Sequence, residues 1–145
     1  MSSKPQFYKQ ATSYSCVPAC LRMVLAGLGL SLSEAELRDR CDCTVFGTEA
    51  LKAVDAVRQL GFERSQKVNL SLSELTTLVR SDVYPIVYVN LKPIDNIQCS
   101  HAVVVVSIAD ESCGVYDPMQ GERCLPLALF EASWRLMNGL AIVVH

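Results

Sequence analysis

The chain has 145 residues, of which 50% are hydrophobic and 19% are charged, and its formal net charge is −2. This length suits a single domain, residues 1–145, that can bury a core without disulfides or metals. A charge so close to zero argues against nucleic acid or an anionic membrane as the main partner, because both attract clustered Lys and Arg. No apolar run approaches the ~20 residues that a membrane-spanning helix needs, and the oligomeric state is left open.

The seven cysteines are an odd number, so they cannot all pair within one chain. The N-terminal residues, Met1 to Gln6, lack the apolar segment of a secretory signal. Together these features predict a cytoplasmic protein whose thiols stay reduced. Most of the cysteines are then expected to be buried packing groups.

Helical patterns fill the first part of the chain, from about residue 10 to 80. Apolar residues recur at spacings of three and four after Cys16 and after Thr48, as in helices with one buried face. The two stripes consist of Leu21, Val24, Leu25 and Leu28, and of Leu51, Val54, Val57 and Leu60. Serine followed three residues later by glutamate, the spacing of a capping box, predicts a short helix from Ser33 through Arg38 and another from Ser71 to about Arg80. Thr48 could cap the helix that lies between them.

Strand patterns dominate the second part, from about residue 83 to 145. Residues 85–91, 102–108 and 113–117 are rich in β-branched and aromatic side chains, which favours strands. Residues 126–137 read as a helix carrying Leu129, Phe130 and Trp134, and residues 140–144 as a last strand. Helices followed by an antiparallel-looking sheet, with no linker between them, predict an α+β fold.

His101 is the histidine with a candidate partner. The other histidine, His145, is the last residue, and we expect it to take no part in chemistry. If residues 102–108 and 114–117 form a hairpin, position 101 faces about 117–121, so Asp117 lies across from or next to His101. A buried histidine at a strand end and an Asp-Pro turn are the structural alternatives for these two residues.

Cys16 is the best-placed nucleophile for such a histidine. Pro18 is favoured in the first turn of a helix, so Cys16 falls at or just before the helix N-terminus. The helix dipole and the unpaired N–H groups there stabilise a thiolate. Cys20 lies four residues further along the same helix and is expected to pack in the core.

The segment from Gln10 to Leu21 resembles the opening motif of the C39-type papain-like cysteine peptidases, which include the double-glycine leader peptidases of bacteriocin exporters. In that family a glutamine lies six residues before the catalytic cysteine, as Gln10 does before Cys16. A histidine opening an apolar strand and an Asp-Pro sixteen residues later, here His101 and Asp117, complete the pattern. The similarity extends from about Gln10 to Val144.

The resemblance implies a papain-like fold with the site in a cleft between a helical half and a sheet half. It implies that Cys16 is the nucleophile, His101 the general base and Asp117 the group that orients the imidazole. Gln10 would donate a hydrogen bond to the oxyanion. The expected substrate is a peptide or small protein, with a double-glycine cleavage site suggested by the family, and no cofactor or metal is expected.

One position departs from the family pattern, since Val17 stands where the family usually has glycine. This side chain is expected to alter the floor of the cleft and the substrate range. The chain also has no Gly-rich phosphate loop, so we expect a stand-alone domain without the transporter's ATPase.

Three alternatives stay open on the sequence. The domain could bind peptides without cleaving them, or it could use the same residues as an amidase, isopeptidase or acyltransferase, since water and amines can intercept the same acyl-enzyme. A metal site built on Cys41 and Cys43 is the third, although a Cys-x-Cys pair is not the usual zinc spacing and no second matching pair exists.

Overall fold

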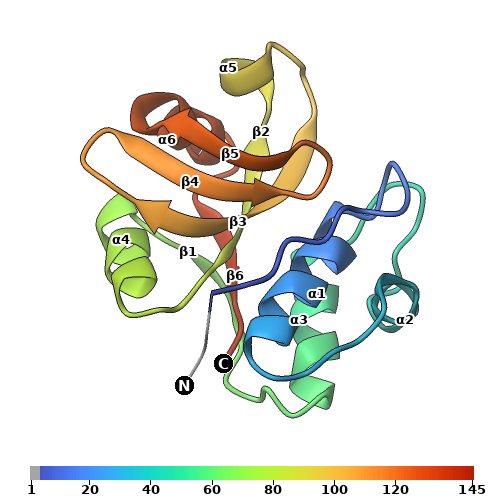
Figure 1. The fold of residues 1–145 in the computed structure, drawn as a ribbon. Helices are drawn as coiled ribbons and strands as arrows, with labels where there is room; N and C mark the ends of the chain where they lie inside the picture. Colours follow the sequence, from blue (N-terminus) through green and yellow to red (C-terminus); the bar gives the residue numbers. More distant parts are fainter. Residues whose placement is uncertain (1–3) are drawn as a thin grey trace.

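The computed structural model describes residues 4–145 and consists of a six-stranded antiparallel sheet with helices on both faces (Figure 1). The strand order is β1-β6-β2-β3-β4-β5. The strands are β1 (Gln66–Asn69), β2 (Ile86–Asn90), β3 (Ser100–Ile108), β4 (Ser112–Asp117), β5 (Gly121–Pro126) and β6 (Leu140–Val143). The helices are α1 (Cys16–Gly27), α2 (Glu34–Arg40), α3 (Ala50–Gln59), α4 (Leu72–Arg80), α5 (Lys92–Asp95) and α6 (Leu127–Arg135). This is the expected α+β class.

One face of the sheet packs against the helical half, formed by α1, α2 and α3 (Figure 1). Alternate residues of β3, Ala102, Val104 and Val106, join the apolar side chains of these helices in one core. Leu21 and Leu25 of α1 are fully buried there, as their helical spacing predicts. The N-terminus of α1 is thereby fixed against the start of β3.

The opposite face of the sheet is covered by α4 and α6. The intervening residues of β3, Val103 and Val105, pack there with Phe130 and Trp134 of α6, both fully buried. Because β3 is buried on both faces, its near-continuous run of valines is explained. Ser71 and Glu74 form both hydrogen bonds of the predicted capping box at the start of α4.

The structure differs from the sequence-based expectations in several elements. It adds β1, β5 and α5, and α2 continues to Arg40 rather than ending at Arg38. Glu49, not Thr48, is the N-cap of α3. Leu51 and Leu129 were expected on buried faces but are 54% and 42% exposed, because the buried sides of α3 and α6 are built on other residues of the same helices.

The pairing of β3 with β4 determines how close the start of β3 lies to the end of β4, where His101 and Asp117 are found. Val104 faces Tyr116, and a register shift separates the Val105 pair from the Ser107 pair nearer the turn. Continuing the Val104 register would place residue 101 opposite residue 119, two positions from Asp117. The start of β3 and the end of β4 therefore lie at the same end of these two neighbouring strands, beside the N-terminus of α1 (Figure 1).

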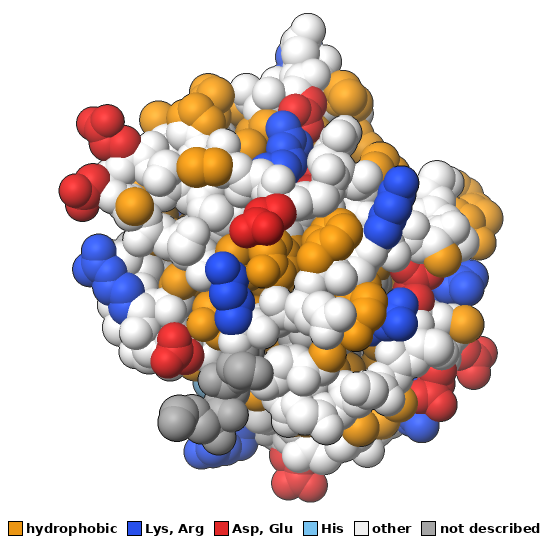
Figure 2. Space-filling model, viewed as in Figure 1, with side chains coloured by type: hydrophobic (Ala, Val, Ile, Leu, Met, Phe, Trp, Pro, Cys, Tyr) orange, Lys and Arg blue, Asp and Glu red, His pale blue; other side chains and the backbone are white. Residues whose placement is uncertain are grey.

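Charged side chains of both signs are interspersed over the face in Figure 2, and hydrophobic side chains gather near its middle. Within residues 4–145, no helix is long and apolar enough to cross a membrane.

Candidate active site

Cys16 is the first residue of α1, as the position of Pro18 predicts. Its side chain is partly exposed, whereas Cys20, one turn further on, is fully buried and donates to the carbonyl oxygen of Ala102 at 3.5 Å. The Cys16 backbone N–H lies in the first turn, where no preceding turn supplies an acceptor. Cys16 therefore combines an accessible thiol with a main-chain N–H in the first turn of α1, and Cys20 joins the helix to β3 through its hydrogen bond.

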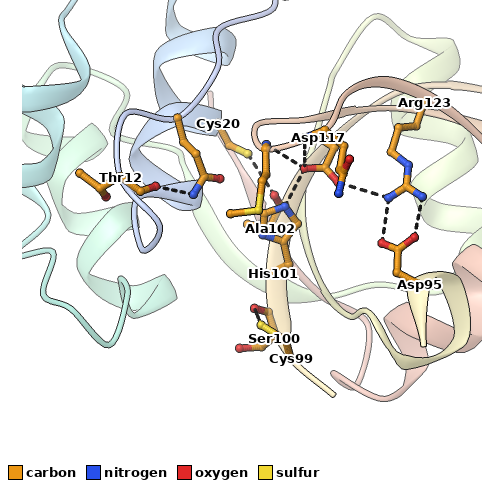
Figure 3. A network of polar contacts seen from close by, with 12 residues as sticks. Thr12, Cys20, Asp95, Cys99, Ser100, His101, Ala102, Asp117 and Arg123 are labelled. Carbon is orange, nitrogen blue, oxygen red and sulfur yellow. Dashed lines mark hydrogen bonds and ion pairs between the residues drawn. The ribbon is translucent and has the colours of Figure 1, made fainter. Parts of the chain in front are cut away.

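His101, near the start of β3, and Asp117, at the end of β4, contact each other at one end of these paired strands (Figure 3). The imidazole Nε2 lies 2.8 Å from Asp117 Oδ1, and the two side chains are 7% and 2% exposed. Because Nε2 faces Asp117, the other ring nitrogen, Nδ1, is left for a second partner. The thiol of Cys16 is one of the groups that raise the pKa of His101.

His101 and Asp117 each favour the charged form of the other. Burial by itself lowers the pKa of His101, but hydrogen bonds and charges from Asp117 and Cys16 outweigh it and raise the pKa to about 9. Burial raises the pKa of Asp117, and this is likewise outweighed by the hydrogen bond and charge of His101 and by backbone N–H donors, so the pKa of Asp117 is lowered. Near neutral pH the pair is an imidazolium beside a carboxylate.

The turn between β4 and β5 holds the Asp117 carboxylate in place. Oδ1 also accepts hydrogen bonds from the backbone N–H groups of Met119 and Gln120, at 2.9 and 3.2 Å. Arg123 of β5 donates to Oδ2 at 3.4 Å and forms a bidentate pair with Asp95 of α5, at 2.8 and 3.0 Å (Figure 3). No sequence pattern pointed to Arg123 or Asp95 as site residues, because they lie in β5 and α5, which were not predicted.

Gln10 is 8% exposed and lies in the segment that precedes α1. Its backbone N–H donates to the carbonyl oxygen of Pro118 at 2.8 Å, and its side-chain Nε2 donates to the Thr12 carbonyl at 2.6 Å. The amide oxygen of Gln10 is buried and has no partner among residues 4–145. Since an amide nitrogen carries two N–H groups, one donor of Gln10 is left over for another acceptor.

A cleft of about 300 Å³ between the two halves is lined by Cys16 and Val17 of the helical half and by His101 and Met119 of the sheet half. Neither Gln10 nor Asp117 is among the described residues that line it. The turn at residues 44–47 also contributes to the lining, and its Phe46 is 97% exposed. Val17 is 2% exposed, so most of its side chain packs in the core beneath the floor of the cleft.

The remaining candidates lie elsewhere. His145 lines a separate cavity of about 380 Å³ beside β1 and α4. Cys41 is buried and Cys43 partly buried, and burial raises the pKa of the Cys41 thiol to about 12, which disfavours the thiolate that zinc requires. Over the described part of the chain, no three His, Cys, Asp or Glu side chains are grouped so that they could hold a metal ion.

Comparison with known proteins agrees with this geometry. The model of the peptidase C39 family matches residues 4–145. An uncharacterized protein of Methanothermobacter thermautotrophicus is 28% identical over 136 residues, which cover 94% of this chain and 85% of the relative.

Two solved structures share the fold. The peptidase domain of Streptococcus ComA, a bi-functional ABC transporter involved in a quorum-sensing pathway, matches with a TM-score of 0.81 and 25% identity over 98% of each chain. A double glycine motif protease from an AMS/PCAT transporter, solved in complex with a leader peptide, matches with a TM-score of 0.79 and 20% identity. That match covers 99% of this chain and 94% of the protease.

Proposed function

Because this chain belongs to the peptidase C39 family, we propose that it is a cysteine peptidase in which Cys16 is the nucleophile, His101 the base, Asp117 the orienting carboxylate and Gln10 an oxyanion donor. The observation that carries the proposal is the contact of His101 with Asp117 at 2.8 Å, in the cleft that Cys16 also lines. A histidine held in this way, with its second nitrogen left for a thiol, is the arrangement that activates a cysteine.

The first chemical step is attack by the Cys16 thiolate on the scissile carbonyl carbon. Protonated His101 stabilises the thiolate, so no separate deprotonation is needed. As the C–S bond forms, the carbonyl π electrons move to oxygen. The spare N–H of Gln10 and the backbone N–H of Cys16 bind this oxyanion, and each such donor contributes about 3–4 kcal/mol in comparable sites.

The second step breaks the C–N bond. The proton on His101 passes to the leaving amine, which departs and leaves a thioester on Cys16. His101 is then neutral and takes a proton from water as the water attacks the thioester. Collapse of this second tetrahedral intermediate breaks the C–S bond, releases the carboxylic acid and restores the Cys16 thiolate beside protonated His101. Asp117 keeps the imidazole oriented throughout and stabilises its positive charge whenever it is protonated.

We propose a peptide or small protein as the substrate, cleaved after a double-glycine site. The support is the chain's resemblance to a protease whose structure contains a leader peptide and whose name includes a double glycine motif. The apolar turn at residues 44–47 offers a surface for substrate residues further from the cleaved bond.

A reducing setting such as the cytoplasm fits this role. All seven cysteines are free thiols, and Cys99 and Cys124 are exposed. Exposed thiols persist where glutathione and thioredoxin keep them reduced, and the nucleophile must also stay reduced to react.

Alkylation by iodoacetamide across pH, with each cysteine mapped by mass spectrometry, tests the catalytic pair. We expect Cys16 to react much faster than exposed Cys124 below pH 7 and to lose this advantage in His101→Ala. Incubation with peptides containing a Gly-Gly site, compared with Cys16→Ala, then tests cleavage. An ordinary reaction rate at Cys16 would contradict the proposal, and fast alkylation without any cleavage would favour a binding module.

A further inference from the structure

Glu34 is a buried carboxylate outside the catalytic residues. It is the first residue of α2 and is only 5% exposed. A carboxylate is rarely buried to this extent unless its charge is paired and hydrogen-bonded. The capping contact at this helix start uses Ser33 and the backbone of Glu36, so it does not account for Glu34.

The carboxylate has two partners on different sides. Oε1 accepts a hydrogen bond from the backbone N–H of Ala11 at 2.8 Å, across 23 residues of sequence. Oε2 lies 3.4 Å from Nε of Arg38, one turn along α2, whose side chain is 31% exposed. This contact is an ion pair and not a hydrogen bond, since neither atom has a hydrogen-bond partner among residues 4–145. Arg38 balances the charge from the surface side, and Ala11 is the only backbone group for which the described structure gives a hydrogen bond to the carboxylate.

This contact fixes the peptide next to Gln10. The N–H of Gln10 donates to Pro118 in the sheet half, and the N–H of Ala11 donates to Glu34 in the helical half. Two successive N–H groups are therefore held by acceptors in the two halves of the fold. The side chain between them is constrained at its base, while its Nε2 is held by Thr12.

We infer that Glu34 is a positioning residue for the reaction, which holds the 10–11 peptide so that the spare N–H of Gln10 points at the oxyanion. The inference rests on the proposed role of Gln10. A hydrogen bond to a charged acceptor is about twice as strong as one between neutral groups, so a carboxylate holds this peptide more firmly than an amide would. Oxyanion stabilisation depends on such preorganisation, because a donor that must reorient loses much of its effect.

The test separates oxyanion binding from thiol reactivity. A peptide aldehyde ending in Gly-glycinal forms a hemithioacetal whose oxygen occupies the oxyanion position, whereas iodoacetamide alkylates the thiol without forming an oxyanion. We expect Glu34→Ala to weaken aldehyde binding about 10- to 100-fold, less than the roughly 100- to 1,000-fold effect of removing a donor outright because the donor is displaced and not lost, and to leave the alkylation rate of Cys16 unchanged. Glu34→Gln keeps an acceptor and should recover part of the loss. Glu36→Gln, on the exposed side of the same helix, is the matched control.

Combination with Gln10→Ala shows whether Glu34 acts through Gln10. In the Gln10→Ala background, Glu34→Ala should change aldehyde binding by less than about 3-fold, because coupled residues are not additive. A full additional loss in that background would overturn the inference, and so would an equal loss of alkylation in Glu34→Ala.

Wild-type controls separate the two proposals. If the wild-type protein binds the aldehyde and alkylates rapidly while both Glu34 variants match it, the role of Glu34 is refuted and the proposed function stands. If the wild-type protein does neither, the proposed function fails and the role of Glu34 fails with it. Thermal unfolding of each variant shows whether it is folded, and Glu34→Gln provides the test if Glu34→Ala does not fold.

Discussion

The backbone N–H of Gln10 donates to the carbonyl oxygen of Pro118 at 2.8 Å. Pro118 directly follows Asp117, so the segment before α1 is bonded to the turn that holds the carboxylate of the His101 pair. Gln10 belongs to the segment leading into the helical half, and Pro118 belongs to the sheet half. The proposed oxyanion donor and the orienting carboxylate therefore lie in one hydrogen-bonded unit that crosses the cleft.

Gln10→Ala is expected to lower kcat about 100-fold on a peptide with a Gly-Gly site, because it removes one oxyanion donor. KM should change little, since the donor acts mainly in the transition state. Peptide hydrolysis followed by chromatography gives both constants. The Cys16 alkylation rate is the control, and a parallel loss of alkylation would mean that the variant disturbs the thiol and not the oxyanion alone.

Phe46→Ala tests the apolar turn at the end of the cleft. Phe46 is 97% exposed, so its removal should leave the melting temperature unchanged. An exposed aromatic side chain beside a substrate cleft is a candidate anchor for apolar substrate residues, and its truncation should raise KM about 3- to 10-fold with little change in kcat. Leu136→Ala is the control, because Leu136 is 58% exposed at the end of α6, away from the cleft. Equal KM values for the two variants would rule out this contact.

Arg123→Met tests the ion pairs of Arg123 with Asp117 and Asp95, which we call the Arg123 clamp. Arg123 carries a positive charge 3.4 Å from Asp117, which opposes protonation of both Asp117 and His101. Its removal should raise the pKa of each group, so both limbs of the pH–activity profile are expected to shift to higher pH. Loss of the Asp95 contact should also lower kcat, because Asp117 is less firmly held.

The control for the clamp is Arg80→Met, which removes an exposed arginine at the end of α4. This variant should keep the wild-type profile. A shift of the same size in both variants would indicate a general charge effect, and a shift to lower pH in Arg123→Met would contradict the assigned interaction.

The elements that carry the site were predictable because their patterns are strong. The Leu21 and Leu25 stripe and the valines of β3 bury on the expected faces, and Pro18 marks the start of α1. The separation of His101 and Asp117 follows from a hairpin with a short turn, where the register is limited to a few values. The irregularity between Val105 and Ser107 shifts that register by one residue, too little to separate the pair.

Other parts of the fold and of the site have no sequence pattern of comparable strength. In β1 none of the four residues is fully buried, so its sequence lacks the alternation of a half-buried strand. Arg123 and Asp95 lie 28 residues apart on two elements that were not predicted, and only the folded sheet brings them together. The serine–glutamate spacing predicts that Ser33 caps the helix through the backbone N–H of Glu36, as observed. It gives no information on the direction of the Glu34 side chain.

The free energy of unfolding should fall at alkaline pH as His101 loses its proton. Burial lowers the pKa of His101, but Asp117 and Cys16 raise it to about 9, whereas an unfolded histidine titrates near 6.5. Because the folded state binds this proton more tightly, the stabilisation is fully present below about pH 6.5 and is lost as the pH rises through about 9. At about 1.4 kcal/mol per pKa unit, the contribution is at most about 3 to 4 kcal/mol.

Urea unfolding of the wild type and of His101→Gln at pH 6, 7.5 and 9.5 measures this contribution. All other titratable groups are the same in the two proteins, so the difference between the two free energies isolates His101. The wild type should be more stable than the variant at pH 6, and the gap should narrow at pH 7.5 and be smallest at pH 9.5. A gap that stays constant with pH would show that folding leaves the pKa of His101 unchanged, and a gap that widens as the pH rises would show that folding lowers it. In either case His101 would be mostly neutral at pH 7.5, and Cys16 would need a different source of activation.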